Sequence, residues 1–394
     1  MSSVVRRVLL PVGIVVAIAL VAWLVHARPG GRDLSFSLLA GAAFGLVLQR
    51  ARFCFLCNFR DFIEKREPQG LLAIIIALAA GVVLYYAVIM AWVPVPQPER
   101  LPPNAHIGPV GPVLALAAFV FGIGMAISGS CLSAHFYRLG EGSPSSPFAL
   151  IGAAIGFVIG FLTWNSLFTL SIYSNEALWL PHSLGYSATI LLSLGLCALL
   201  AFLVLYFASG KEQTVTTTLT LKSALASVFV NRWPPAVAGI AVAAISAFAY
   251  FRVAPLGVTA ELGSIARTAG TSAGWLPETL HGLDGLRGCA TVIKQALLSN
   301  NGLFVMGLIA ASFASALAAN KFQPQRPRPG QIISGLTGGI LMGWGAMTGL
   351  GCTVGVLLSG IHAGAVSGWV FLIFCTAGVW LGLMGMRRFA RRAA

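Results

Sequence analysis

Long apolar stretches divide this sequence, and they constrain its fold more than any other feature. A membrane-spanning helix needs about 20 mostly apolar residues, and nine stretches are close to that length. They cover residues 8–26, 69–93, 110–128, 147–170, 185–208, 235–252, 302–319, 330–348 and 364–386. Of the 394 residues, 57% are hydrophobic and 9% are charged, whereas soluble domains contain about 25% charged residues. The sequence therefore predicts an all-α polytopic membrane protein and excludes a soluble enzyme, a nucleic-acid-binding domain and a disordered chain.

Two shorter apolar stretches, 34–49 and 254–270, contain glycine, and each is followed by a segment rich in Gly, Cys and Arg. Non-helical backbone is tolerated at membrane depth only where protein or water satisfies its amides and carbonyls. We therefore expect these stretches to be re-entrant or broken helices. Without counting these two stretches, we expect about nine or ten helices that cross the membrane completely.

The distribution of positive charge predicts the orientation. Lys and Arg number 25 against 11 Asp and Glu, a net charge of +14. Because short cytoplasmic loops retain Lys and Arg, we expect the loop 321–328 and the Arg-rich C-terminus in the cytoplasm, and the loop 171–183 outside. The stretch 8–26 is too long for the apolar part of a signal peptide and has no clean cleavage site after it, so we expect a retained span.

The two halves of the chain resemble each other. The segments FGIGMAISGSC (121–131) and MGWGAMTGLGC (342–352) share two glycines and the final cysteine. A weaker match joins the region after Cys57 to the region after Cys289. We predict an internal duplication with two pseudo-symmetric repeats, an arrangement that places transporter sites at the interface of the repeats. The expected divisions are an N-terminal span (1–33), a first repeat (34–208), a cytoplasmic linker (209–234) and a second repeat (235–394).

Thiols and guanidinium groups occur together in QRARFCFLCNFRDF (49–62), where Cys54 and Cys57 lie between Arg50 and Arg60. Arg binds oxyanions through two parallel charge-assisted hydrogen bonds, so this segment is a candidate anion site. The alternative is that the Arg residues are positive-inside anchors and the thiols pack as small hydrophobes. A zinc site is not expected, because no second close Cys or His pair supplies the other two ligands.

Cys131 and Cys352 occupy matching positions in the two repeats, each directly after the glycine-containing end of an apolar helix. Gly129 and Gly351 permit backbone conformations that let a helix end inside the membrane and turn its amides toward a ligand. A single cysteine in an apolar helix usually serves packing, but the duplicated context favours a functional role here. Cys54, Cys131 and Cys352 are therefore the main candidates for a substrate path, together with Arg50, Arg60, Gly129 and Gly351.

A second group of candidates lies in the segment 281–289, where Arg287 and Cys289 accompany several glycines. It fits an irregular segment of the path or an ordinary loop equally well. Cys197 and Cys375 lie mid-helix and are assigned to packing. Carboxylates are nearly absent from the apolar stretches, Glu261 being the clearest exception, which disfavours a cation pump. Phosphate-binding, haem and flavin motifs are absent, so we expect no cofactor and no metal.

Three motifs make the chain similar to a known family. RARFCF and FRDF within 50–62, SGSCLSAHFYRLGEG at 128–142 and GGILMGWGAMTGLGC at 338–352 resemble the YeeE/YedE family of bacterial inner-membrane sulfur-transport proteins, and the similarity spans roughly residues 34–386. The resemblance implies uptake of a small sulfur oxyanion, thiosulfate in the best-understood members, through two pseudo-symmetric halves with re-entrant helices.

The resemblance also implies residue roles and a partner. Three cysteines line the path in that family, and by motif they correspond to Cys54, Cys131 and Cys352. A separate TusA-like sulfur-carrier protein often works on the cytoplasmic side. The additional span at 8–26 and the extra thiols Cys57 and Cys289 depart from the family pattern.

Our hypothesis is a transporter rather than an enzyme, in which neutral thiols pass thiosulfate along by S–H hydrogen bonds. A dianion in the bilayer needs donors to replace its water, and a series of weak sites allows it to leave again. The alternatives are a membrane sulfurtransferase in which Cys54 takes sulfur from thiosulfate as a persulfide, a transporter of sulfite, persulfide or selenium species, and a membrane anchor for a partner protein. Channel-like and coupled transport, and monomer and dimer, fit the sequence equally well.

Overall fold

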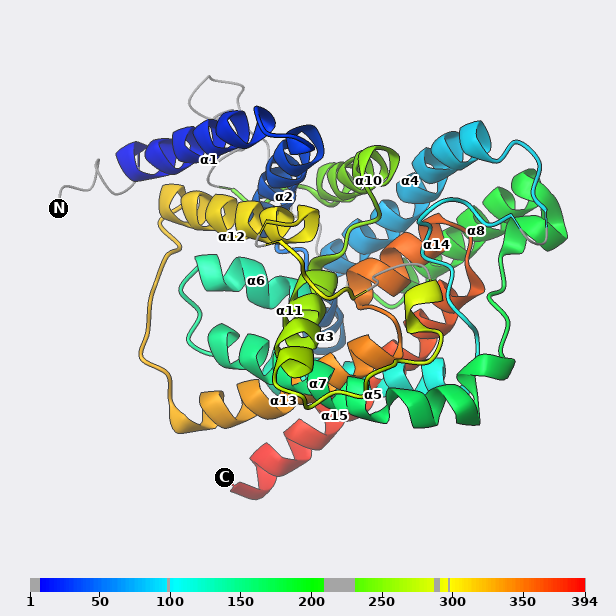
Figure 1. Ribbon diagram of the computed structural model, residues 1–394. Helices are drawn as coiled ribbons and strands as arrows, with labels where there is room; N and C mark the ends of the chain where they lie inside the picture. The colour runs from blue at the N-terminus through cyan, green and yellow to red at the C-terminus, as the bar shows by residue number, and fades with distance from the viewer. Residues whose placement is uncertain (1–7, 98–99, 209–230, 287–290, 297, 394) are drawn as a thin grey trace.

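The computed structural model describes residues 8–97, 100–208, 231–286, 291–296 and 298–393. Within these ranges the chain is helical and contains no β-strand (Figure 1). Its long helices are α1 (Leu10–His26), α2 (Gly31–Ala51), α4 (Gln69–Trp92), α5 (Pro112–Ser128), α7 (Ser146–Leu170), α8 (Leu180–Tyr206), α10 (Pro235–Arg252), α12 (Asn300–Ala318), α13 (Pro329–Thr348) and α15 (Val366–Ala393). Its shorter helices are α3 (Phe55–Lys65), α6 (Leu132–Gly140), η2 (Ile172–Ser174), α11 (Val258–Ser272), η3 (Leu283–Gly285), the π-helical η4 (Thr353–Ser359) and α14 (Gly360–His362).

Eight helical segments in the described residues are long and apolar enough to cross a membrane, and the bent pair formed by α13 and η4–α14 makes a ninth if it is counted as one span. The prediction of a polytopic all-α membrane protein is confirmed. α1, with 17 residues, is shorter than the other spans. The prediction of a short helix at 34–49 is wrong in length, because α2 has 21 residues and begins at Gly31. Its first turn holds charged residues, among them Asp33, which suits the positive end of a helix dipole but falls outside an apolar stretch.

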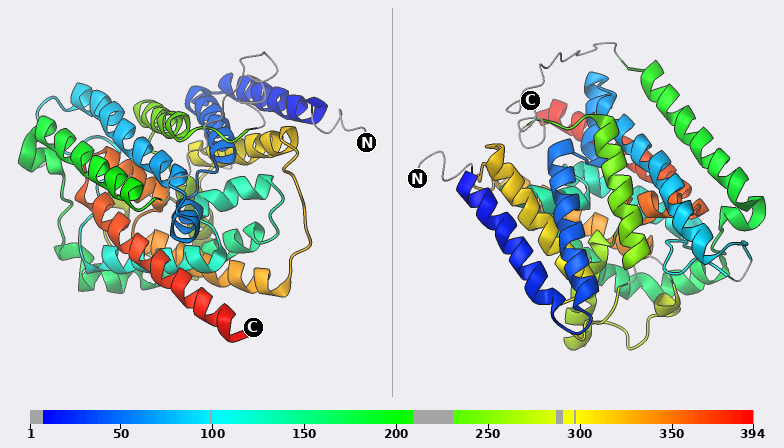
Figure 2. Two further views of the ribbon diagram at one scale, coloured as in Figure 1. Left: turned by 180° about the vertical axis from the view of Figure 1, so that it is seen from behind. Right: turned by 90° about the horizontal axis from the view of Figure 1, so that it is seen from above.

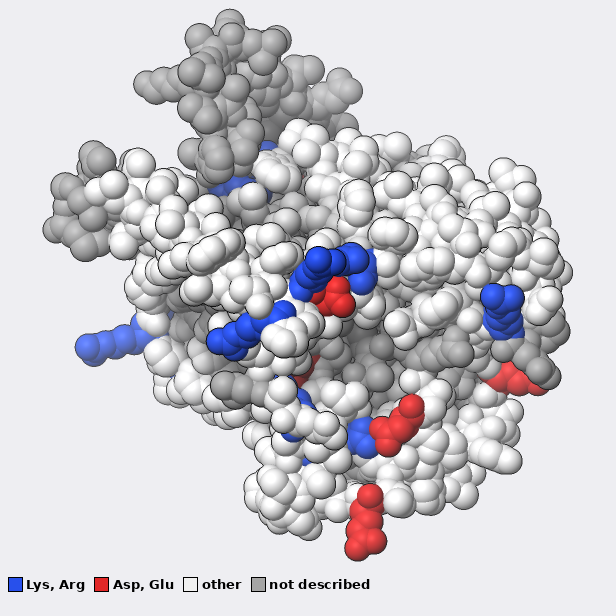
Figure 3. Space-filling view, turned by 45° about the horizontal axis from the view of Figure 1, so that its top comes forward, with Lys and Arg blue, Asp and Glu red and all other residues white. Residues whose placement is uncertain are grey.

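Apolar side chains cover the outside of the bundle. Leu191 and Phe202 on α8 are 71% and 63% exposed, as expected for side chains that contact lipid instead of water. The space-filling view shows broad surfaces without charge, interrupted by a few small groups of Lys, Arg, Asp and Glu (Figure 3). This surface fits a membrane interior, where charged groups are costly.

The helices form two rows. α1, α12, α2, α10, α4 and α8 follow one another in the first row, as the view from above shows (right panel of Figure 2). α7, α13, α5 and α15 pack in that order in the second row. Short helices fill the space between the rows: α6 and α11 each contact both α12 and α7, and α14 contacts both α4 and α15. The breaks in the chain therefore lie between two layers of protein, where their backbone groups are shielded from lipid.

The packing partners are exchanged between the two halves. α2 packs on α12 and α4 on α10, while α5 packs on α15 and α7 on α13. α5 and α13, which carry the matching glycine motifs, pack on each other. Two repeats related by a two-fold axis would pack in this way. The duplication and its domain boundaries remain predictions, and most of the expected linker, 209–230, lies outside the described residues.

The bundle has two distinguishable ends. We call the end that holds residues 231–234 and 319–328 the linker end, where the Arg232 guanidinium donates to the Ala51 carbonyl at 3.3 Å. We call the opposite end, which holds residues 93–97, 100–111 and 171–179, the loop end. α4 joins the two and is about 36 Å long at 1.5 Å per residue. The C-terminal part of α15 lies at the linker end, because Arg387 pairs with Glu64 at 3.0 Å.

Candidate functional site

Two chain breaks bring thiols together between the rows of helices. α2 ends with Arg52 in the left-handed region (φ 52°), and Cys54 then caps the N-terminus of α3, where its sulfur accepts the Cys57 amide at 3.4 Å. α5 ends at Gly129 (φ 81°), and Cys131 begins α6. These turns carry the two sulfurs into one buried cluster.

Ser130 lies at the centre of this thiol cluster. Its hydroxyl is 3.6 Å from the Cys54 sulfur and 4.0 Å from the Cys57 sulfur. The Cys54 thiol also contacts the thiols of Cys57 and Cys131. Cys131 in turn lies 3.4 Å from the Ser133 hydroxyl. We refer to Cys54, Cys57, Cys131, Ser130 and Ser133 as the thiol cluster; its members are buried, with Cys57 the most accessible at 8%.

A cationic cavity opens next to the thiol cluster at the linker end. It has a volume of about 380 Å³, and Cys57 lies in its wall. The charged residues that line it are Arg52, Arg60, Arg138, Arg232 and Lys321, with Asp61 and Glu141. Arg138 on α6 links the cavity to the cluster, because its guanidinium donates to the Cys57 sulfur at 3.6 Å. The excess of positive charge suits a small anion, which would meet guanidinium donors directly before the thiols.

The structure separates the two predicted arginine candidates. Arg60 lines the cavity and is 3.9 Å from Asp61. Arg50 is 1% exposed, and its Nε donates to the Gln49 side chain at 2.6 Å. Gln49 also donates to Glu141 at 3.0 Å. Arg50 thus lies behind the cavity wall, where it contributes positive potential without lining the cavity.

The third candidate thiol, Cys352, lies in a second broken helix. After α13, Leu350 has a left-handed conformation (φ 61°) and Gly351 has φ 150°, so the chain turns before Cys352 caps η4. The Cys352 sulfur accepts the Val354 amide at 3.4 Å and lies beside the Thr259 hydroxyl in the first turn of α11. Among the described residues, no hydrogen bond joins Cys352 to Cys54 or Cys131. The candidate path therefore has two separate thiol groups.

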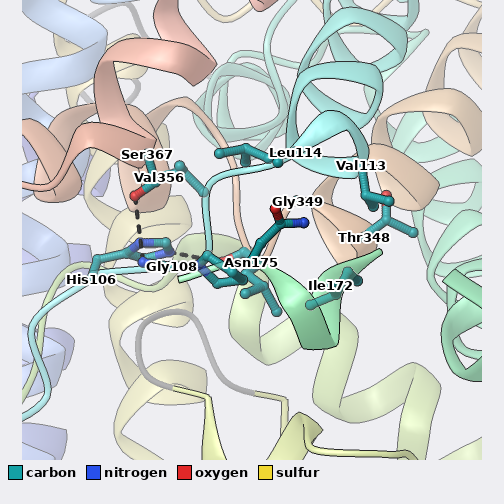
Figure 4. A pocket seen from close by; sticks show the side chains of 13 residues that line it. His106, Gly108, Val113, Leu114, Ile172, Asn175, Thr348, Gly349, Val356 and Ser367 are labelled. Atoms are coloured by element: carbon teal, nitrogen blue, oxygen red, sulfur yellow. Dashed lines mark hydrogen bonds between the residues drawn. The ribbon is translucent and has the colours of Figure 1, made fainter. Parts of the chain in front are cut away.

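A loop from the other half of the chain holds the Cys352 turn. His106 is buried, and its Nε2 lies 2.8 Å from the Leu350 carbonyl, so the neutral ring donates from Nε2. Burial lowers the pKa of His106, which keeps this ring neutral. The small pocket beside it, of about 20 Å³, has room for about one water molecule, and its lining residues come from several segments (Figure 4). The pocket is too small for a sulfur oxyanion, so we do not assign it to substrate binding.

The arrangement at Cys352 corresponds to that at Cys131. In the first half, Cys54 at the start of α3 meets the turn after α5; in the second, Thr259 at the start of α11 meets the turn after α13. The position that matches Cys54 in space is therefore held by a hydroxyl. Sequence comparison pairs Cys57 with Cys289 instead, but Arg287 and Cys289 lie outside the described residues. Ser130 was recoverable from the SGSC motif, and Arg138 from its place seven residues after Cys131, whereas nothing in the sequence singles out Thr259.

The buried charged groups Glu261 and Arg267 in the second half each have a partner of opposite charge. Glu261 forms an ion pair with Lys294 and accepts the Ser299 hydroxyl at 2.7 Å. Arg267 donates to Asp284 at 2.7 Å, and this contact lowers the pKa of the Asp284 carboxyl. Glu261 therefore supports α11 and is not arranged as a proton relay. In the part of the chain that the structure describes, no group of three His, Cys, Asp or Glu residues is placed to bind a metal.

Comparison with known proteins gives a consistent result. A family model described as "Sulphur transport" matches residues 50–381. A protein of Spirochaeta thermophila named thiosulfate transporter TsuA is 28% identical over 353 residues, covering 87% of this chain and 96% of the relative. The Escherichia coli protein of the same name is 26% identical over 364 residues, covering 87% and 92%. The probable transporter YedE of Salmonella typhimurium is 28% identical over 153 residues, or 39% of this chain and 36% of the relative.

Proposed function

This chain belongs to the Sulphur transport family, and from that premise we propose that it carries thiosulfate across the bacterial inner membrane into the cytoplasm. The family and the relatives are named for transport and not for an enzymatic reaction, in agreement with the prediction of a transporter. The choice of thiosulfate rests on the two relatives that share most of their length with this chain and are named as thiosulfate transporters.

The observation that carries the proposal is the contact between the thiol cluster and the cationic cavity. A sulfur oxyanion has negative oxygens that suit guanidinium donors and a soft terminal sulfur that suits thiols. Arg138 and Cys57, 3.6 Å apart, offer both kinds of contact at one place. The adjacent Cys54 and Cys131 extend the thiol contacts away from the cavity into the protein.

The proposed route runs from Cys352 to the thiol cluster and then to the cationic cavity. Gly129 and Gly351 allow the turns that present Cys131 and Cys352. Arg60 receives the anion in the cavity, and the buried Arg50 adds attraction from behind its wall. Several weak contacts in series favour passage, because a substrate held by one strong site leaves slowly.

In the proposed orientation the linker end faces the cytoplasm. Lys321 and Arg232 lie in the cavity at this end, and cytoplasmic segments retain Lys and Arg. The contact of Arg387 with Glu64 supports the same side for the C-terminal part of α15. A separate TusA-like carrier protein would then meet the arriving anion at the cationic cavity.

The test is uptake of radiolabelled thiosulfate into proteoliposomes that contain this protein alone. We expect time-dependent accumulation that protein-free liposomes lack and that excess unlabelled thiosulfate suppresses. If transport appears only after a TusA-like carrier is enclosed in the vesicles, the route needs an acceptor. If sulfite or selenite enters and thiosulfate does not, the assigned substrate is wrong.

The pH dependence of uptake is expected to depend on Lys321. Burial, together with Arg52 and Arg50 nearby, lowers the pKa of Lys321. Its charge is therefore present below that lowered pKa and lost as pH rises through it, at lower pH than for an ordinary lysine of pKa about 10.4. We expect the affinity for thiosulfate to fall on the alkaline side in the wild type and to persist to higher pH in Lys321→Arg, since arginine stays charged. Superimposable pH profiles of KM for the two proteins would exclude this role.

A further inference from the structure

Each of the three thiols predicted from the sequence, Cys54, Cys131 and Cys352, has a buried hydroxyl beside it. The Ser130 hydroxyl is 3.6 Å from the Cys54 sulfur, and the Ser133 hydroxyl is 3.4 Å from the Cys131 sulfur. The Thr259 hydroxyl lies beside Cys352. Ser130 lies in the break between α5 and α6, Ser133 lies in the first turn of α6, and Thr259 lies in α11. The hydroxyls therefore come from both halves of the chain, and one local motif does not account for all three.

Buried hydroxyls usually bond to the backbone of their own helix, and several in this protein do. The Ser312 hydroxyl, for example, donates to the Leu308 carbonyl at 2.6 Å and contacts the Gly45 carbonyl at 3.1 Å. Thr259 behaves differently: it is 1% exposed, and its Oγ1 has no hydrogen-bond partner among the described residues apart from the Cys352 thiol beside it. An unsatisfied buried hydroxyl costs about 1–3 kcal/mol, so it calls for an explanation.

We propose that Ser130, Ser133 and Thr259 contact the passing anion directly and make the route selective for oxyanions of sulfur. This inference rests on the proposed function. At rest each hydroxyl and its thiol satisfy each other weakly. When the anion arrives, the hydroxyl turns its proton to an anionic oxygen, while the thiol contacts the terminal sulfur.

The chemistry of the two groups explains why both are present. An S–H group is a weak donor, whereas an O–H group forms short, strong hydrogen bonds to anionic oxygen. A path lined by thiols alone would replace little of the water that a dianion loses. A thiol and a hydroxyl side by side match the two ends of a molecule that has one soft sulfur and several hard oxygens.

The experiment compares thiosulfate uptake by wild type, Thr259→Val, Thr259→Ser and Ser312→Ala in proteoliposomes. Valine keeps the shape of threonine and removes its hydroxyl, so we expect KM to rise about ten- to hundred-fold, the range for losing a hydrogen bond to a charged group. Thr259→Ser restores the donor and is expected to have a KM within about three-fold of wild type. Ser312→Ala, the matched control, removes an equally buried hydroxyl that touches no thiol and should leave KM unchanged.

A second measurement separates substrate contact from a structural role. Sulfate carries oxygens but no terminal sulfur, so its inhibition of uptake should weaken in Thr259→Val more than inhibition by hydrosulfide, which has no oxygen. If Thr259→Val does not insert, Ser130→Ala and Ser133→Ala provide the same comparison. A wild-type KM and unchanged inhibition in the hydroxyl variants would overturn this inference alone. A wild-type protein that takes up no thiosulfate would overturn the proposed function, and this inference with it.

Discussion

Replacing Cys131 or Cys352 by alanine is expected to reduce thiosulfate uptake to the background of protein-free liposomes. Each sulfur lies at a chain break that is closed to solvent, 1% exposed for Cys131 and 0% for Cys352. Alanine leaves an apolar gap where the terminal sulfur of the anion would be held. The hydroxyl beside each thiol, Ser133 or Thr259, reaches only the anionic oxygens, so the dianion still meets a barrier of several kcal/mol at that point. The measurement is the initial rate of labelled uptake at equal amounts of inserted protein.

Cys197→Ala is the control for this prediction. Cys197 is buried to a similar degree, 2% exposed, but lies on α8 at the edge of the first row and away from the proposed route. The Cys197→Ala variant should take up thiosulfate at the wild-type rate. If Cys352→Ala transports at the wild-type rate while remaining folded, the second half of the route does not pass this thiol, and only the thiol cluster at Cys131 would remain as a candidate.

Gly343→Val is expected to destabilise the protein by about 3 kcal/mol, at the upper end of the cost of overpacking, and to lower the yield of folded protein in detergent. α13 and α7 touch backbone to backbone at this position, where a Cβ on Gly343 would lie 2.8 Å from the Ala153 Cα. Atoms of a neighbouring backbone cannot move aside as a side chain can. Thermal unfolding followed by fluorescence or circular dichroism in detergent measures the effect.

Gly195→Val provides the comparison. A Cβ at Gly195 on α8 meets no atom within 4 Å, so valine should change the unfolding temperature little. Equal stability of the two variants would show that α7 and α13 can move apart at this position, and their backbone contact would then have no energetic importance.

The sequence alone determined the membrane fold and most of the thiol positions. An apolar stretch of about 20 residues crosses the membrane as a helix, because a helix pairs its own backbone N–H and C=O groups by hydrogen bonds and leaves few of them to face lipid. Gly129, two residues before Cys131, and Gly351, directly before Cys352, predicted breaks at those places, and both breaks are present. Spanning helices and helix breaks depend on residues that are close together in the chain, so the sequence alone predicts them.

What the tertiary structure decided is which of these residues meet. It placed Arg60 in the cavity wall and Arg50 behind it, although both flank the same thiols in sequence. It brought Arg138 to Cys57 and Thr259 to Cys352, across 81 and 93 residues respectively. Contacts of this kind arise from the packing of the two helix rows around the broken helices. Because packing depends on shape and distance between remote segments, apolar patterning within each segment does not specify it.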